Sequence, residues 1–120
     1  MRSRWVEHNG QKVFYQDFSN LFYNVEFIKD ELENVQEVVL NEPQNSVLVL
    51  SDFTNTEVSG DLMGILNQAS RATKTHVRKT AVLGVTGIKR TFGDLLSRIT
   101  GQPLSYFTSE TDAMEWLTKN

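Results

Sequence analysis

The chain has 120 residues, of which 39% are hydrophobic and 22% are charged, and its formal net charge at pH 7 is −3. This length and composition fit one folded domain over residues 1–120 and exclude a disordered or low-complexity chain. The lack of cysteine excludes disulfides, thiol nucleophiles and cysteine-ligated metals and favours a reducing compartment, so we expect a cytoplasmic protein.

Charge and hydropathy exclude two further classes. A net negative charge argues against nucleic-acid binding, and the longest aliphatic run, at 47–50, is far shorter than the ~20 residues of a membrane span. The charge is nevertheless segregated, since residues 20–62 hold nine acidic residues and one lysine, whereas residues 63–109 hold seven basic residues and one aspartate. This asymmetry fits either a charged partner or two solvated faces of opposite sign.

At the N-terminus, two segments rich in strand-forming residues flank Asn9-Gly10, a pair favoured in two-residue turns, which predicts a hairpin of 5–8 and 12–15. Apolar residues then recur at steps of three and four, which predicts a helix with Ser19 or Asn20 as its N-cap. These apolar residues are Leu21, Val25, Ile28, Leu32, Val35 and Val39.

After Pro43, which ends that segment, buried-strand patterns alternate with helical patterns. Unbroken aliphatic runs indicate strands that are covered on both faces, and apolar residues at helical spacing indicate the helices between them. The expected elements are strands at 46–51, 80–85 and 104–107 and helices at 62–69, 88–99 and 113–117.

These elements predict an α/β fold with a mixed, mostly parallel sheet, an N-terminal hairpin and four helices. The strand at 46–51 is expected in the middle of the sheet, and the hairpin at an antiparallel edge. The last three strands are expected to be parallel and joined by helical crossovers. Because ligands of such sheets usually bind at the carboxyl ends of the strands, the loops at 51–59 and 85–90 are the expected place for a site.

A two-glycine turn after the strand at 80–85 is one candidate anion-binding site. It contains Gly84, Thr86, Gly87, Lys89 and Arg90. A strand that passes through such a turn into a helix presents backbone N–H groups and a positive dipole end to an anion, and the two basic residues add charge. The spacing matches neither a P-loop nor a dinucleotide-binding fingerprint. The alternative is a tight structural turn with solvated basic side chains.

Ser59, which precedes Gly60 at the start of a predicted helix, is the second candidate. It is either a phosphoacceptor surrounded by backbone donors or a simple N-cap that contributes about 1 kcal/mol. Asp52, Glu57 and His76 fall near the same sheet edge, but no spacing among them reproduces a catalytic triad. We therefore expect no catalytic residue, no metal and no cofactor.

A group of aromatic residues occupies the segment 14–27. Such a cluster either lines an apolar pocket or belongs to the core or to an interface. Its members are Phe14, Tyr15, Phe18, Phe22, Tyr23 and Phe27.

The C-terminal two-thirds resembles the STAS-like superfamily of anti-sigma-factor antagonists and cytoplasmic domains of sulfate transporters. The resemblance rests on the stretches 47–53 (VLVLSDF), 57–66 (EVSGDLMGIL) and 80–90 (TAVLGVTGIKR). Ser59 and Gly60 match the phosphoacceptor serine and the glycine of the family's Asp-Ser-Ser-Gly motif. Glu57 and Val58 stand where that motif has aspartate and serine.

The chain looks most similar to small stand-alone bacterial members, through its Gly-Val-Thr-Gly-x-Lys-Arg turn and its C-terminal Ala-x-x-Trp-Leu helix. This resemblance implies an α/β sheet without metal or catalytic apparatus, and a protein partner, a nucleotide, an anion or an anionic lipid as the molecule recognised.

Three hypotheses follow. The first is a non-enzymatic interaction or regulatory domain, recognised at Ser59 and at the 85–90 turn. The second is a carrier of a small molecule or lipid, with a lipid-transfer-like fold and a pocket closed by the aromatic first helix. An unrecognised hydrolase ranks last. The exposed edge of the hairpin also suggests a homodimer.

Overall fold

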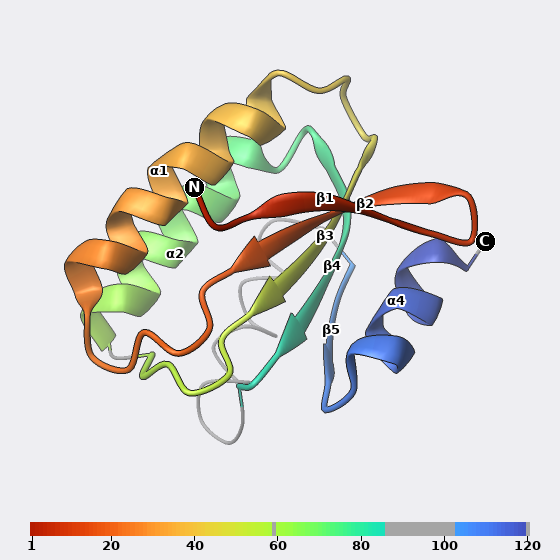
Figure 1. Cartoon of the computed structure of the whole chain (residues 1–120). Helices are drawn as coiled ribbons and strands as arrows, with labels where there is room; N and C mark the ends of the chain where they lie inside the picture. The colour runs from red at the N-terminus through yellow and green to blue at the C-terminus, as the bar shows by residue number, and fades with distance from the viewer. Residues whose placement is uncertain (59, 86–102, 120) are drawn as a thin grey trace.

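The computed structural model is an α/β sandwich built on one five-stranded sheet (Figure 1). The structure describes residues 1–58, 60–85 and 103–119. No helix in these segments is long and apolar enough to cross a bilayer. The elements are β1 (Arg4–His8), β2 (Gln11–Asp17), α1 (Val25–Leu40), β3 (Val47–Asp52), α2 (Gly60–Thr73), β4 (Val77–Leu83), β5 (Leu104–Phe107) and α4 (Glu110–Thr118). Helices α1 and α2 cover one face of the sheet, and α4 covers the other (Figure 1).

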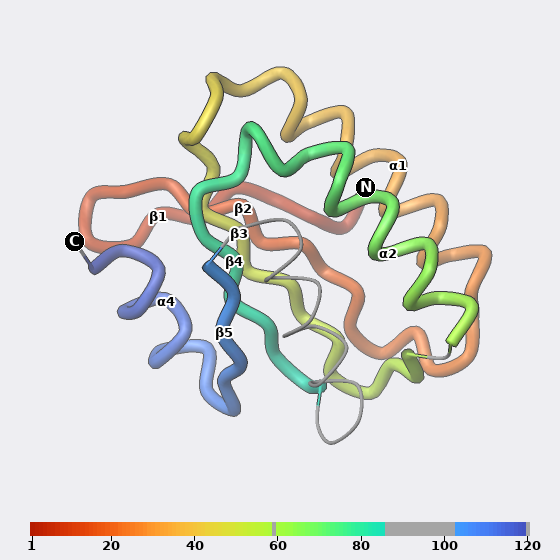
Figure 2. The backbone as a smooth tube through the Cα atoms, turned by 180° about the vertical axis from the view of Figure 1, so that it is seen from behind, coloured from red at the N-terminus to blue at the C-terminus, as the bar shows by residue number. Residues whose placement is uncertain are grey.

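The strands lie across the sheet in sequence order, from β1 to β5. β1 and β2 pair antiparallel, and the other neighbours pair parallel, which confirms the predicted fold class, the edge hairpin and the central strand. Parallel strands in unbroken order with right-handed connections place their crossovers on one face, which agrees with the common face of α1 and α2 (Figure 2). Because the order of the described strands never reverses, they form no switch point of the kind at which open α/β sheets bind ligands.

The first helix begins later than predicted, so Ser19 and Asn20 were wrong as N-caps. Asn24 caps the helix instead, and the helix starts at Val25. The backbone explains the difference, because Asn20 and Phe22 have φ angles of 56° and 51°. These angles lie in the left-handed region, which cannot continue a right-handed helix.

The later elements match their predictions with shifted ends. β4 spans Val77–Leu83 rather than 80–85, because Gly84, at a φ of 82°, turns the chain away from the sheet. The Ser109 side chain caps α4 by accepting a hydrogen bond from the Asp112 amide at 3.3 Å, so this helix begins at Glu110, before the predicted 113. Of the four helices expected, the described residues contain three, and the helix expected at 88–99 lies outside them.

Two apolar layers join the helices to the sheet. Every residue of β3 is buried, as expected of a central strand. Its Val49 belongs to the layer under α1 and α2, whereas Leu48 and Leu50 belong to the layer under α4. In the α4 layer, Leu50, Ala113 and Leu117 are 0% exposed, so this side leaves little room for additional atoms.

Two buried or half-buried polar contacts fasten segments that are distant in sequence. The Glu31 carboxylate on α1 accepts hydrogen bonds from the Arg2 and Ser3 amides and from the Ser3 hydroxyl at distances of 2.5 to 3.2 Å. The Lys79 ammonium on β4 donates to the Trp116 and Lys119 carbonyls at 2.9 Å. Lys79 thereby satisfies carbonyl groups that the end of α4 leaves unpaired.

Candidate functional site

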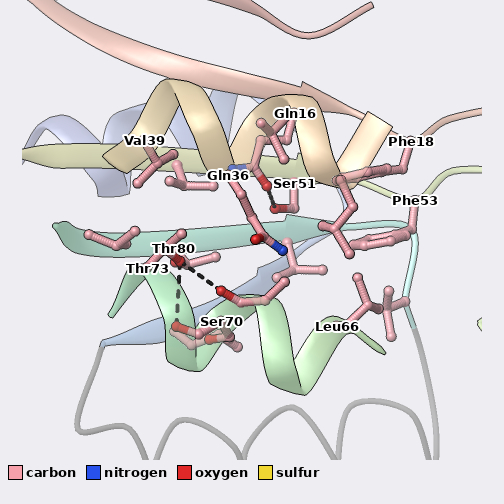
Figure 3. A pocket seen from close by; sticks show the side chains of 18 of the residues that line it. Gln16, Phe18, Gln36, Val39, Ser51, Phe53, Leu66, Ser70, Thr73 and Thr80 are labelled. Carbon is pink, nitrogen blue, oxygen red and sulfur yellow. Dashed lines mark hydrogen bonds between the residues drawn. The ribbon is translucent and has the colours of Figure 1, made fainter. Parts of the chain in front are cut away.

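A cavity of about 140 Å³ lies between the sheet and the helices α1 and α2 (Figure 3). Its described lining is mainly aliphatic and comes from both layers. Val35 of α1 and Leu66 of α2 face Val49 of β3 and Val82 of β4 across it. The stacked rings of Phe18 and Phe53, whose centroids are 5.1 Å apart, also line it.

The sequence explains why this layer contains space. α1 and α2 pack closely on each other, whereas α4 packs directly on β3, β4 and β5. Small side chains line the cavity on both sides, with Ala69, Ser70 and Thr73 on α2 and Ser51 and Thr80 on the strands. Side chains of this size do not fill the gap between the sheet and the two helices that cover it.

A small group of uncharged polar side chains faces this cavity. Gln16 and Ser51 are neighbours in register on β2 and β3, and the Ser51 hydroxyl donates a hydrogen bond to the Gln16 Oε1 at 3.0 Å. The Gln36 side chain extends from α1 toward the strands (Figure 3). Among the described residues, neither the Gln16 Nε2 nor the Gln36 amide has a hydrogen-bond partner. Both groups are therefore available to a molecule in the cavity.

A second depression, of about 400 Å³, lies at the carboxyl edge of the strands. Phe22 and Tyr23 border it, and these two residues are 59% and 81% exposed. The loop that carries Phe22 forms a parallel bridge with Thr56, and the Glu57 amide donates to the Phe22 carbonyl at 2.7 Å. None of the described residues that line this edge is basic, so they do not by themselves form an anion site.

Of the candidate anion-binding residues, only Gly84 falls within the described part of the chain, and it borders this edge depression. A Cβ atom at Gly84 would lie 2.5 Å from the Thr54 amide nitrogen and 2.7 Å from the Phe53 carbonyl carbon. Close backbone packing therefore accounts for this glycine without a ligand. Ser59, Thr86, Gly87, Lys89 and Arg90 lie outside the described residues.

Asp52 and His76, which the sequence places near the carboxyl edge, and the second histidine, His8, are engaged in separate structural contacts. The His76 Nδ1 lies 2.8 Å from the Glu42 carbonyl oxygen, and the His8 Nε2 lies 2.7 Å from a Glu115 carboxylate oxygen. Asp52 accepts hydrogen bonds from the Tyr15 hydroxyl and from Thr54. Within the described residues, no group of three histidine or acidic side chains could hold a metal ion.

The aromatic segment divides between the core and the surface. Phe14 and Phe18 are buried, whereas Phe22, Tyr23 and Phe27 are exposed. α1 contributes aliphatic residues and Gln36, and none of its aromatic residues, to the cavity. The expectation that an aromatic first helix closes the pocket was therefore wrong.

The buried pair of Tyr15 and Asp52 gives an expected pH dependence. Burial, together with the hydrogen bond to the Asp52 carboxylate, raises the pKa of the Tyr15 phenol above its ordinary value of 10.0. The unfolded chain therefore releases this proton first, and stability that is fully present below pH 10 falls as the pH rises above it.

Urea unfolding between about pH 8 and about pH 11 measures this slope. Tyr15→Phe is expected to reduce it, and Tyr23→Phe, which changes a phenol that is 81% exposed, is expected to leave it unchanged. Equal slopes in the wild type and Tyr15→Phe contradict the assignment.

Comparison of the chain with family models, with curated proteins and with solved structures gave no match. The candidate site therefore rests on the geometry of the cavity. Sequence reasoning missed the cavity residues Gln16, Gln36 and Ser51. The signal in the sequence was the polar residues Gln16 and Ser51 at inward positions of the neighbouring strands β2 and β3. Such residues are unusual in a layer that is otherwise aliphatic.

Proposed function

We propose that the protein is a non-enzymatic binding protein or carrier for a small, mostly apolar molecule, held in the cavity between the sheet and α1 and α2. The observation that carries this proposal is an aliphatic cavity of about 140 Å³ with a few convergent polar groups. Sites for small ligands typically combine an apolar lining with a small number of placed polar side chains. An engineered apolar cavity of ~150 Å³ in another protein binds benzene, so a cavity of similar volume can hold a ligand of that size.

The volume narrows the ligand class. A cavity of this size holds roughly one six-membered ring with a small substituent. A nucleotide or the two acyl chains of a phospholipid are far larger. The proposal therefore favours the small-molecule version of the carrier hypothesis over its lipid version.

Benzene titration with thermal denaturation tests the proposal. A ligand at 100 times its dissociation constant adds ~2.7 kcal/mol to the free energy of unfolding, which raises the Tm of a domain of this size by several degrees. Ala69→Leu places new carbon atoms inside the cavity. We expect it to abolish the benzene-induced rise in Tm while changing the stability of the unliganded protein by less than ~1 kcal/mol.

Ala113→Leu is the matched control, because it adds the same atoms to the closely packed layer under α4. It is expected to cost about 1–3 kcal/mol of stability through overpacking and to retain the benzene-induced rise in Tm. A wild-type protein whose Tm does not respond to benzene, or an Ala69→Leu variant that keeps the full response, contradicts the proposal.

A regulatory interaction domain of the STAS-like group is the second candidate function, with a protein partner, or a homodimer, covering the carboxyl edge. Two observations support it. Phe22 and Tyr23 are exposed, and the φ of 51° at Phe22 is a strained backbone angle that costs a bulky residue ~1–3 kcal/mol of free energy. In this second candidate function, the partner recognises Ser59 and the turn at 85–90. The absence of cysteine from the whole chain supports a cytoplasmic location.

Tyr23→Ser tests this second candidate because it removes an exposed ring without touching the core. The partner-binding hypothesis expects the variant to lose a partner that co-purifies with the wild type. Equal recovery of that partner by both proteins, or a mass near 13.7 kDa in light scattering for the proposed homodimer, counts against it.

A further inference from the structure

We infer that the cavity selects an uncharged ligand with one hydroxyl or amide group, and that Gln16, Ser51 and Gln36 recognise this group. The inference rests on the proposed function and specifies the chemistry of its ligand. It excludes carboxylates and phosphates, which carry charge at neutral pH, and it expects pure hydrocarbons to bind no more tightly than their hydroxylated analogues.

The charge of the lining is the first line of support. None of the described residues that line the cavity is Asp, Glu, Lys, Arg or His. Moving an ionised carboxylate or phosphate into such a layer without a counter-charge costs several kcal/mol or more. A bound molecule is therefore expected to be neutral.

The hydrogen-bonding capacity of the lining is the second line of support. The Ser51 hydroxyl is a donor toward Gln16, so its oxygen retains acceptor capacity, and the Gln16 Nε2 is a donor without a partner among the described residues. A ligand hydroxyl placed beside this pair can donate to Ser51 and accept from Gln16. The Gln36 amide reaches into the same cavity from α1 and offers one further donor and one further acceptor (Figure 3).

The position of Gln16 and Ser51 within the layer predicts how a bound ligand is oriented. Gln16 and Ser51 lie side by side on β2 and β3, whereas Val82, the register neighbour of Ser51 on β4, is apolar. The polar end of a ligand is therefore expected over β2 and β3, and its apolar body over β4. A hydrocarbon ligand would leave the two glutamine amides unpaired, whereas a hydroxylated ligand can form hydrogen bonds with them.

Calorimetric titration with phenol, benzene and benzoate near neutral pH tests the inference, because the three share a ring and differ in one substituent. We expect phenol to bind at least as tightly as benzene, although phenol must give up its hydration, and benzoate to bind at least tenfold more weakly than phenol. Ser51→Ala is expected to weaken phenol about fivefold and to change benzene less than twofold. Ser105→Ala, the same substitution on β5 outside the cavity lining, is expected to change neither.

The outcomes separate the inference from the function on which it rests. If benzene does not bind the wild type, the proposed function fails, whatever the result with phenol and benzoate. If benzene binds tighter than phenol, or benzoate as tightly as phenol, the cavity binds ligands but the recognition of a neutral polar group is overturned. An equal loss of phenol and benzene affinity in Ser51→Ala also overturns it, because a general structural effect of the substitution would produce that result.

Discussion

Gly84→Ala is expected to lower the free energy of unfolding by about 3 kcal/mol or more. Two costs combine at this position. The φ of 82° lies in a region that L side chains rarely adopt, and the added Cβ would lie 2.5 Å from the Thr54 amide nitrogen. The second contact is with backbone, which cannot rotate away as a side chain tip does. The end of β4 therefore has to separate from the loop after β3, which holds Phe53 in the cavity wall.

Gly10 supplies the matched control, because its φ is 76° and nothing lies within 4 Å of the place that a Cβ atom would occupy. Gly10→Ala therefore measures the backbone contribution alone and is expected to cost about 1 kcal/mol. Urea unfolding of both variants gives the comparison. Equal losses at the two positions would show that close packing at Gly84 contributes nothing.

Glu31→Ala is expected to cost about 2–3 kcal/mol, the second largest loss. Glu31 is 4% exposed, and its carboxylate accepts hydrogen bonds from the Arg2 and Ser3 amides and from the Ser3 hydroxyl. Removing this acceptor leaves the donors of Ser3, itself 4% exposed, without their partner in the interior. It also releases the N-terminal segment from α1.

Glu33→Ala is the control for Glu31→Ala, since it removes an exposed carboxylate two residues along the same helix. It is expected to change stability by no more than ~0.5 kcal/mol. Chemical denaturation with hydrogen exchange at Val6 and Val13 would report both the global loss and the loosening of β1 against β2. A Glu31→Ala variant as stable as Glu33→Ala would contradict the assigned role of the carboxylate.

Most of the fold could be predicted from patterns that burial imposes on sequence. Asn9-Gly10 indicated the hairpin, and the unbroken aliphatic run indicated β3. These signals are local, since each depends on the conformational preference of a few residues or on burial of both faces of a strand. The start of α1 was missed because the left-handed backbone at Asn20 and Phe22 is stabilised by the neighbouring loop after β3, a contact between segments distant in sequence.

The candidate site could not be predicted in the same way. For Gly84 the sequence offered either an anion site or a tight structural turn, and its close approach to Phe53 and Thr54 agrees with the turn, although these neighbours are too distant in sequence to be predicted. The cavity depends on how α1 and α2 pack over the sheet and on the small residues of α2 that face it. Gln16 and Ser51 become a pair only when β2 and β3 align in register, and Gln36 joins them only across the layer.

We propose that the layer under α1 and α2, and not the layer under α4, receives the ligand. Methyl chemical shifts recorded by NMR during benzene titration test it most directly, because β3 presents methyl groups to both layers. We expect shifts at Val35, Val49 and Val82, with Leu48 and Leu50 on the opposite face of the sheet unchanged. No shifts at all, or shifts of equal size on the two faces, would contradict the account.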